Sequence, residues 1–170
     1  MHFLGVQMKN CYNIACCCLF MACLTGCNSG PAINRLVSYP GYGFAYLPEG
    51  IGWERPLLAY NQETDVKKLD DAGLLKCLPD LLLADPYSLS LEDAPITDES
   101  VRLIVQLKSL EQISIRGTLI TKKGVEQLAE MHHLHSIFVS RNCLSSEDAS
   151  SIMSKSPRKD LIISRRDIQK

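Results

Sequence analysis

Apolar residues recur along the second half of the chain at a fixed interval of 24 residues, as from Leu89 to Ile113. Four pairs share this interval, and the two members of each pair are next-but-one neighbours: Leu89 and Leu91, Ile113 and Ile115, Ile137 and Val139, and Leu161 and Ile163. Because alternate residues on a strand point to the same face, each pair predicts a short strand with one buried face. The constant interval predicts parallel strands, with Leu89, Ile113, Ile137 and Leu161 on adjacent rungs.

A helix start is predicted after each of the first three strands. Thr97, Thr121 and Ser145 recur at the same interval as the apolar pairs, and their hydroxyl groups can accept hydrogen bonds from the exposed N–H groups of a first helical turn. Each predicted cap has an apolar residue directly before it and another one turn after it, the pattern of a hydrophobic staple. The staple pairs are Ile96 with Val101, Ile120 with Val125, and Leu144 with Ala149. One turn later, Ile104, Leu128 and Ile152 continue the predicted inner face.

Residues 110–120 and 134–144 resemble the leucine-rich-repeat consensus, with Asn142 at the asparagine position and Thr118 as its common bacterial substitute. Residues 97–101 are similar to a bacterial subtype whose helices start with Thr-Asp-x-Gly-Leu. The resemblance covers about residues 69–168, although Ala94 departs from it and the last copy breaks off at 165–168. It implies an α/β fold, a short solenoid over residues 64–170 with parallel strands on a concave face and helices on a convex face.

Residues 1–26 have the three parts of a cleaved signal peptide. Lys9 supplies positive charge, residues 14–24 form an unbroken apolar run, and small residues Thr25 and Gly26 follow. Because a membrane-spanning helix needs about 20 apolar residues, this run is too short to remain in the bilayer. We therefore expect residues 1–26 to be removed. Met8, directly before Lys9, is an alternative start to Met1.

Residues 24–27, Leu-Thr-Gly-Cys, resemble the bacterial lipobox. The resemblance implies that Cys27 is lipidated and becomes the first residue of the mature protein. Two acyl chains would anchor the protein stably, so we expect an exported protein held to the cell membrane or the outer membrane by lipid. The alternative is an apolar leader in which Cys27 is incidental, and Asn28 does not distinguish between the two membranes.

Residues 27–63 differ in composition from both neighbouring segments. They contain four prolines, several glycines and six aromatic residues, and their hydrophobic periodicity is weak. Pro and Gly favour turns, but the aromatic content is too high for a purely solvated linker. The segment is therefore predicted to be a tether over about residues 28–38, followed by irregular or hairpin structure that caps the first repeat.

Charge and cysteine content exclude two classes of protein. The chain has 18 basic and 19 acidic residues, and the leader takes away one Lys and no acidic residue, so the balance argues against nucleic-acid binding. Five of the eight cysteines lie in the leader, so only Cys77 and Cys143 remain beside Cys27. A disulfide between these two is possible, but buried cysteines acting as small apolar side chains are the commoner case. A disulfide-rich scaffold is not expected.

The candidate binding face consists of strand residues that point away from the predicted core. Its members are Ser90, Glu92, Gln112, Ser114, Arg116, Ser136, Phe138, Ser140, Ile162 and Ser164. Phe138 and Ile162 are the apolar members of this polar face, which is typical of an interface hot spot. The alternative is that a neighbouring loop covers them, or that they are isolated exposed residues of no consequence.

The sequence gives little support for a catalytic or metal-binding site. His132, His133 and His135 fall at a predicted turn, no ligand is suitably spaced to complete a tetrahedral site, and we expect them to be solvated. No nucleophile motif is present, and the repeat family has no common catalytic residues to transfer. We therefore expect a non-catalytic protein that binds a protein partner and needs no cofactor, metal or small-molecule substrate. Self-association as a structural envelope component and an uncharacterised enzyme are the alternatives.

Overall fold

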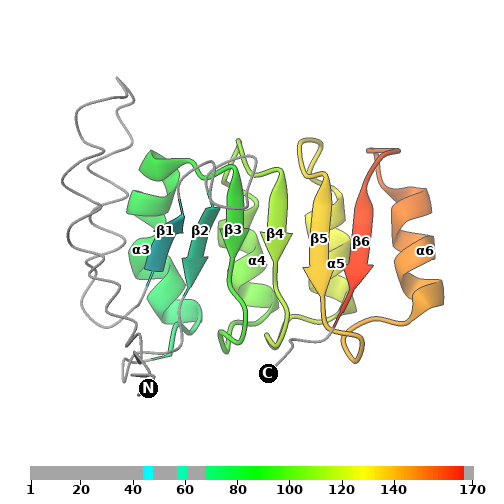
Figure 1. Cartoon of the computed structure of the whole chain (residues 1–170), viewed down its shortest axis with the longest axis horizontal. Coiled ribbons are helices and arrows are strands. Elements are labelled where there is room, and N and C mark those ends of the chain that lie inside the picture. Colours follow the sequence, from blue (N-terminus) through cyan, green and yellow to red (C-terminus); the bar gives the residue numbers. More distant parts are fainter. Residues whose placement is uncertain (1–43, 48–56, 61–67, 167–170) are drawn as a thin grey trace, which may run out of the picture.

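The structure, a computed structural model, describes residues 44–47, 57–60 and 68–166. This part of the chain is an α/β protein, as the sequence predicts, and it has six strands and four helices (Figure 1). The strands are β1 (Phe44–Leu47), β2 (Leu57–Tyr60), β3 (Ser88–Ser90), β4 (Gln112–Ser114), β5 (Ser136–Val139) and β6 (Ile162–Arg165). The helices are α3 (Asp71–Ala84), α4 (Asp98–Ile104), α5 (Lys122–Ala129) and α6 (Ser146–Lys155). The predicted leader, Cys27, the tether and residues 167–170 lie outside the described residues.

All six strands form one sheet in sequence order, from β1 to β6. β1 pairs antiparallel with β2, and every later pair is parallel. Parallel neighbours need a crossover, and α3 to α6 supply it, all on one side of the sheet (Figure 1). Because β2 pairs with β3, the sheet continues across the predicted domain boundary between residues 63 and 64.

The predicted register is confirmed for three of the four rungs. Leu89 pairs with Ile113, and Ile113 with Ile137, on adjacent parallel strands. The prediction for Leu161 is wrong, because it precedes β6, and Ile163 is the residue that pairs with Ile137. The cause is the longer helix before this strand, since α6 has 10 residues where α5 has 8, and β6 starts correspondingly later. A register shift of two residues keeps the same side chains on the core face of the strand, so both Leu161 and Ile163 remain buried.

The three predicted N-caps are confirmed. The hydroxyl of Thr97 accepts a hydrogen bond from the Glu99 N–H at 3.3 Å, and the hydroxyl of Thr121 accepts one from the Lys123 N–H at 3.2 Å. Ser145 caps α6 in the same way. The apolar residues of each staple are buried, as are Ile104, Leu128 and Ile152 of the inner helical faces.

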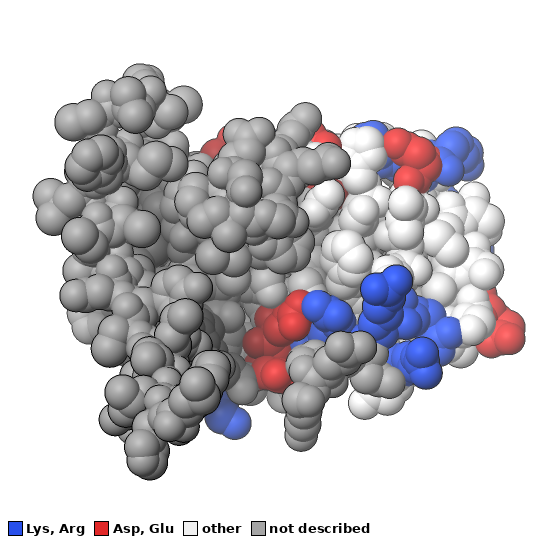
Figure 2. Space-filling view, in the orientation of Figure 1, with Lys and Arg blue, Asp and Glu red and all other residues white. Residues whose placement is uncertain are grey.

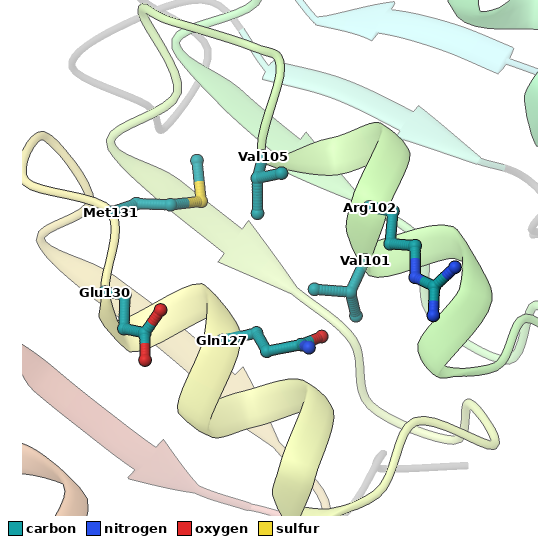
Figure 3. A pocket seen from close by; sticks show the side chains of 6 residues that line it. All are labelled: Val101, Arg102, Val105, Gln127, Glu130 and Met131. Carbon is teal, nitrogen blue, oxygen red and sulfur yellow. The ribbon is translucent and has the colours of Figure 1, made fainter.

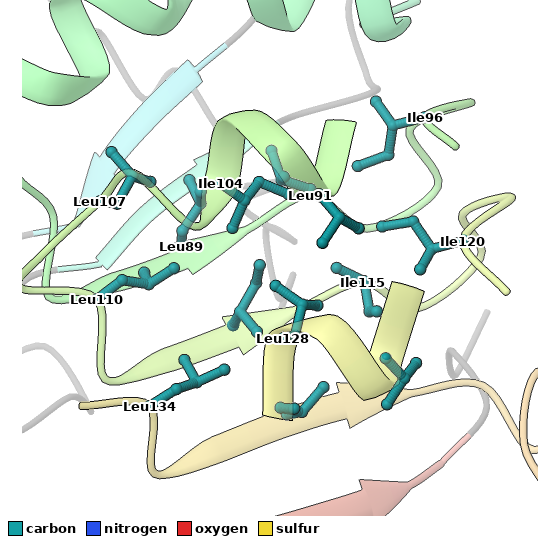
Figure 4. Packing of buried hydrophobic residues seen from close by; sticks show 14 of the residues in the cluster. Leu89, Leu91, Ile96, Ile104, Leu107, Leu110, Ile115, Ile120, Leu128 and Leu134 are labelled. Atoms are coloured by element: carbon teal, nitrogen blue, oxygen red, sulfur yellow. The ribbon is translucent and has the colours of Figure 1, made fainter. Parts of the chain in front are cut away.

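The core lies between the sheet and the helix layer. Figure 4 shows side chains from β3, β4 and the residues directly after them pointing toward those of α4 and α5, among them Leu89, Ile115, Ile104 and Leu128. Each fully buried Leu or Ile contributes about 1.5 to 3 kcal/mol, whereas an exposed ion pair contributes about 0 to 1 kcal/mol. Apolar rows that cross the strands therefore dominate the stability of this fold.

Carboxylates also connect the starts of neighbouring helices, which the sequence did not reveal. Asp71 of α3 accepts hydrogen bonds from the Thr97 N–H at 2.9 Å and the Thr97 hydroxyl at 2.8 Å, and the buried Ser100 hydroxyl also donates to it. Asp98 of α4 accepts the equivalent pair from Thr121, at 2.8 and 2.6 Å. The caps of α4 and α5 are thus held by the preceding helix.

The junction between α5 and α6 uses the same positions differently. Lys122 occupies the position of Asp98, and its Nζ lies 2.6 Å from the Asp148 carboxylate of α6. Asp148 in turn is equivalent to Gly124, which is buried in α5. A Cβ at Gly124 would lie 2.4 Å from Oδ1 of Asp98 and 2.6 Å from Cγ2 of Ile120, so the absence of a side chain lets the Asp98 carboxylate approach.

Candidate binding face

The side chains that alternate with the core rows lie on the face of the sheet opposite the helices, which we call the helix-free face. Strand register aligns them in rows across the sheet. One row contains Ser88, Gln112, Ser136 and Ile162, and the next contains Ser90, Ser114, Phe138 and Ser164. Glu92, Arg116 and Ser140 follow at the carboxyl ends of β3, β4 and β5. Strand alternation therefore brings the ten predicted face residues together.

A polar cluster fixes one end of this face. Glu92 Oε1 accepts hydrogen bonds from the Ser114 hydroxyl at 2.7 Å and from Arg116 Nε at 3.1 Å, and Arg116 also contacts it through a second guanidinium nitrogen. The side chains of Arg116 and Glu92 are 25% and 26% exposed. Ser114, a member of the predicted face, is itself buried and therefore offers little surface to a partner. It orients its two charged neighbours instead.

Phe138 and Ile162 are diagonal neighbours on β5 and β6, because Phe138 pairs with Ser164 and Ser136 pairs with Ile162. Ile162 is 60% exposed, so no loop of the described residues covers it. Phe138 is half-buried. Polar side chains of the same rows surround them, including Ser136, Ser164 and Gln112. The pair therefore forms a small apolar area within a hydroxyl-rich surface.

Basic side chains gather at the carboxyl ends of the strands. Figure 2 shows Lys and Arg side chains toward the lower edge of the helix-free face, next to acidic ones. The arginines that lie at or follow the carboxyl ends of β4 to β6 are Arg116, Arg141, Arg165 and Arg166. Arg165 is held by the turn before α6, since its Nε donates to the Leu144 carbonyl at 2.6 Å. Arg166 is exposed.

The three histidines lie near the opposite edge of the sheet, around the amino end of β5. His132 is exposed, but His133 and His135 are half-buried, so the prediction that all three are solvated is wrong for these two. His135 lies 3.2 Å from both the Glu111 and the Asp160 carboxylates, which neighbouring turns supply. Within the described residues, no group of three such side chains is arranged to hold a metal ion.

A shallow hollow of about 370 Å³ lies on the helix side, between α4 and α5 (Figure 3). Val101, Val105 and Met131 form its apolar part, and Arg102, Gln127 and Glu130 its polar part. The residues around it present neither a nucleophile next to a base nor a pair of carboxylates. We therefore regard the helix-free face as the stronger candidate site.

Cys77 and Cys143 are both free thiols. Burial, together with the charge of Asp80, raises the pKa of Cys77 to about 11. Burial, together with the charge of Asp98, also raises the pKa of Cys143. A thiol reacts as a nucleophile only in its thiolate form, so neither cysteine has the environment of a catalytic one. Cys77, which is fully buried, packs as a small apolar residue.

No family model and no curated protein matches this chain. The described residues also contain no helix with the length and hydropathy that crossing a membrane requires. The function must therefore be argued from the sequence and from the geometry of the sheet.

Proposed function

We propose that this chain is a lipid-anchored, non-catalytic protein-interaction module of the bacterial cell envelope, built as a short leucine-rich-repeat solenoid. The lipobox-like residues that end in Cys27 support export and lipid anchoring. The constant step from β3 to β4 and from β4 to β5, with a capped helix after each strand, supports the repeat assignment. On this proposal, the helix-free face corresponds to the concave binding face of such repeats.

One observation carries the proposal: Ile162 and Phe138 lie side by side on a face that the helices leave uncovered. An apolar residue that is 60% exposed on a sheet gains free energy when a partner covers it. Gln112, Ser136 and Ser140 on the same face offer hydrogen bonds, and the ion pair of Arg116 with Glu92 adds a fixed polar group at its edge. An apolar centre with a polar rim is the usual anatomy of a protein interface.

The test is capture of the partner in intact cells with a photo-reactive amino acid in place of Ile162, followed by measurement of binding to the captured protein. Phe138→Ser is expected to weaken binding about tenfold or more, because it removes an aromatic anchor. Leu119→Ser is the matched control, since Leu119 is 61% exposed but lies outside the rows of the face. Equal binding by both variants would remove Phe138 from the interface.

A further inference from the structure

The solvent side of α3 carries a cluster of exposed apolar side chains, unlike that of the other helices. Three of the five large apolar side chains that are exposed among the described residues lie on it: Leu75 (56% exposed), Leu82 (41%) and Leu83 (61%). Leu75 and Leu82 are two helical turns apart, so they lie on one stripe, with the half-buried Leu78 and the exposed Pro79 between them. A cluster of this kind on one helix marks a contact surface, whereas isolated exposed leucines do not.

The position of α3 points to the surface that it contacts. It lies at the β1 and β2 end of the sheet, and in the described part of the chain it packs against only one other helix, α4 (Figure 1). Phe44, the first residue of β1, is separated from Cys27 only by residues 28–43. A chain of that length spans at most about 60 Å. With Cys27 lipidated, as the proposed function has it, this tether keeps α3 within reach of the headgroups of the same bilayer.

We propose that the apolar side of α3, formed by Leu75, Leu78, Pro79, Leu82 and Leu83, docks on the surface of the membrane to which the chain is anchored. This inference rests on the lipid anchor of the proposed function. Because the anchor makes the contact intramolecular, even a weak apolar interaction is sufficient to populate the docked state. Exposed Lys68 lies shortly before the start of the helix, where its ammonium group can reach lipid phosphates.

Docking through α3 has a consequence for the binding face. The helices and the helix-free face lie on opposite sides of the sheet (Figure 1). A protein resting on α3 therefore directs the row of Phe138 and Ile162 away from the bilayer surface that α3 contacts. The lipid contact would then orient the module, so that its binding face is accessible to a partner.

The test places a photo-crosslinking amino acid at Leu75 or Leu82 of the full chain in bacterial cells, with Leu119, which is 61% exposed, as the control position. After irradiation, mass spectrometry identifies the adducts. We expect lipid adducts at positions 75 and 82 in severalfold higher yield than at position 119. Protein adducts that dominate at positions 75 and 82, or lipid yields equal to those at position 119, would overturn the docking proposal.

Cys27→Ser separates this proposal from the lipid anchor. If the unaltered chain fractionates with membranes and takes up labelled fatty acid through Cys27, but shows no lipid adducts on α3, the anchor stands and the docking is wrong. If Cys27→Ser changes neither fractionation nor labelling while lipid adducts on α3 persist, the anchor is wrong and α3 itself holds the membrane. If the unaltered chain shows neither membrane fractionation with fatty-acid labelling nor lipid adducts on α3, both proposals are wrong.

Discussion

The junction between α3 and α4 and the junction between α5 and α6 use equivalent helix positions for opposite chemistry. In the first, an acidic residue at the start of one helix, Asp71, accepts hydrogen bonds from the cap and third residue of the next, and Ser100 is one of the donors. In the second, the starting residue is basic, Lys122, and the third residue of the next helix is acidic, Asp148. Two neighbouring helices can thus be joined by a carboxylate on the first helix or by a carboxylate on the second.

Burial distinguishes the two junctions. Ser100 is fully buried, and burial by itself raises the pKa of Asp71, but the hydrogen bonds from Ser100 and Thr97 outweigh it and hold the pKa below its ordinary value. Lys122 and Asp148 are 49% and 36% exposed, where water and salt screen their attraction. We infer that the first junction stabilises the helix layer and that the second contributes little.

The largest effect is therefore expected from Asp71→Ala. The substitution leaves the buried Ser100 hydroxyl and the Thr97 N–H without their acceptor, and an unpaired buried donor costs about 1 to 3 kcal/mol. Urea unfolding should show a loss of about 3 kcal/mol in the free energy of unfolding. Asp71→Asn, which keeps one acceptor oxygen, should lose less. Equal losses in both variants would show that charge, and not hydrogen bonding, makes this junction strong.

A smaller loss of unfolding free energy is expected from Gly124→Ala, at the junction between α4 and α5. Alanine normally favours a helix over glycine by about 0.5 to 1 kcal/mol, but here its Cβ meets Asp98 and Ile120. Overpacking costs about 1 to 3 kcal/mol, so we expect a net loss of about 1 kcal/mol in urea unfolding. In an Asp98→Ala background the added loss should shrink, because the nearest clash is gone. An unchanged loss there would assign the strain to Ile120 alone.

The difference between these junctions also shows what the sequence could predict. The caps Thr97, Thr121 and Ser145 were predictable because a cap is set by residues within one turn of it. The bonds of Asp71 and Asp98 were not, because their partners are distant in sequence and depend on how neighbouring helices are placed. The same limit applies to the candidate site, where the face residues followed from strand alternation but their contacts with one another did not.

Three other features escaped prediction for related reasons. The hydrogen bond of Ser114 to Glu92, which also binds Arg116, joins residues at different strands. The carboxylates beside His135 come from separate turns. The shift of β6 arises because the longer α6 delays the strand by an even number of positions, which leaves the alternation of apolar residues intact. β1 and β2 were foreseen only as irregular or hairpin structure, because a segment rich in Pro and Gly carries little periodicity.

The contribution of Asp71, at the junction between α3 and α4, to the unfolding free energy should depend on pH. A carboxyl group whose pKa is lowered by folding stabilises the folded state fully above its unfolded pKa, near the ordinary value of 3.8, and loses this effect as the pH falls through the folded pKa. The difference in unfolding free energy between the unaltered chain and Asp71→Ala should therefore be constant above about pH 5 and shrink at lower pH. Urea titrations from neutral pH down to about pH 3 measure it. A difference that already falls above about pH 5 would mean that burial dominates.

The smallest effect is expected from Lys122→Ala at the exposed junction. The Asp148 carboxylate raises the pKa of Lys122, first through their hydrogen bond, and Lys122 lowers the pKa of Asp148 in the same way, so both groups are charged at neutral pH. Its net contribution is nevertheless small, because two solvated side chains lose entropy on pairing and salt screens their charges. Urea unfolding should give nearly equal free energies for the variant and the unaltered chain, and any difference should disappear in concentrated salt. A loss as large as that of Asp71→Ala, and insensitive to salt, would mean that the inverted pair stabilises its junction as strongly as the hydrogen-bonded carboxylate does.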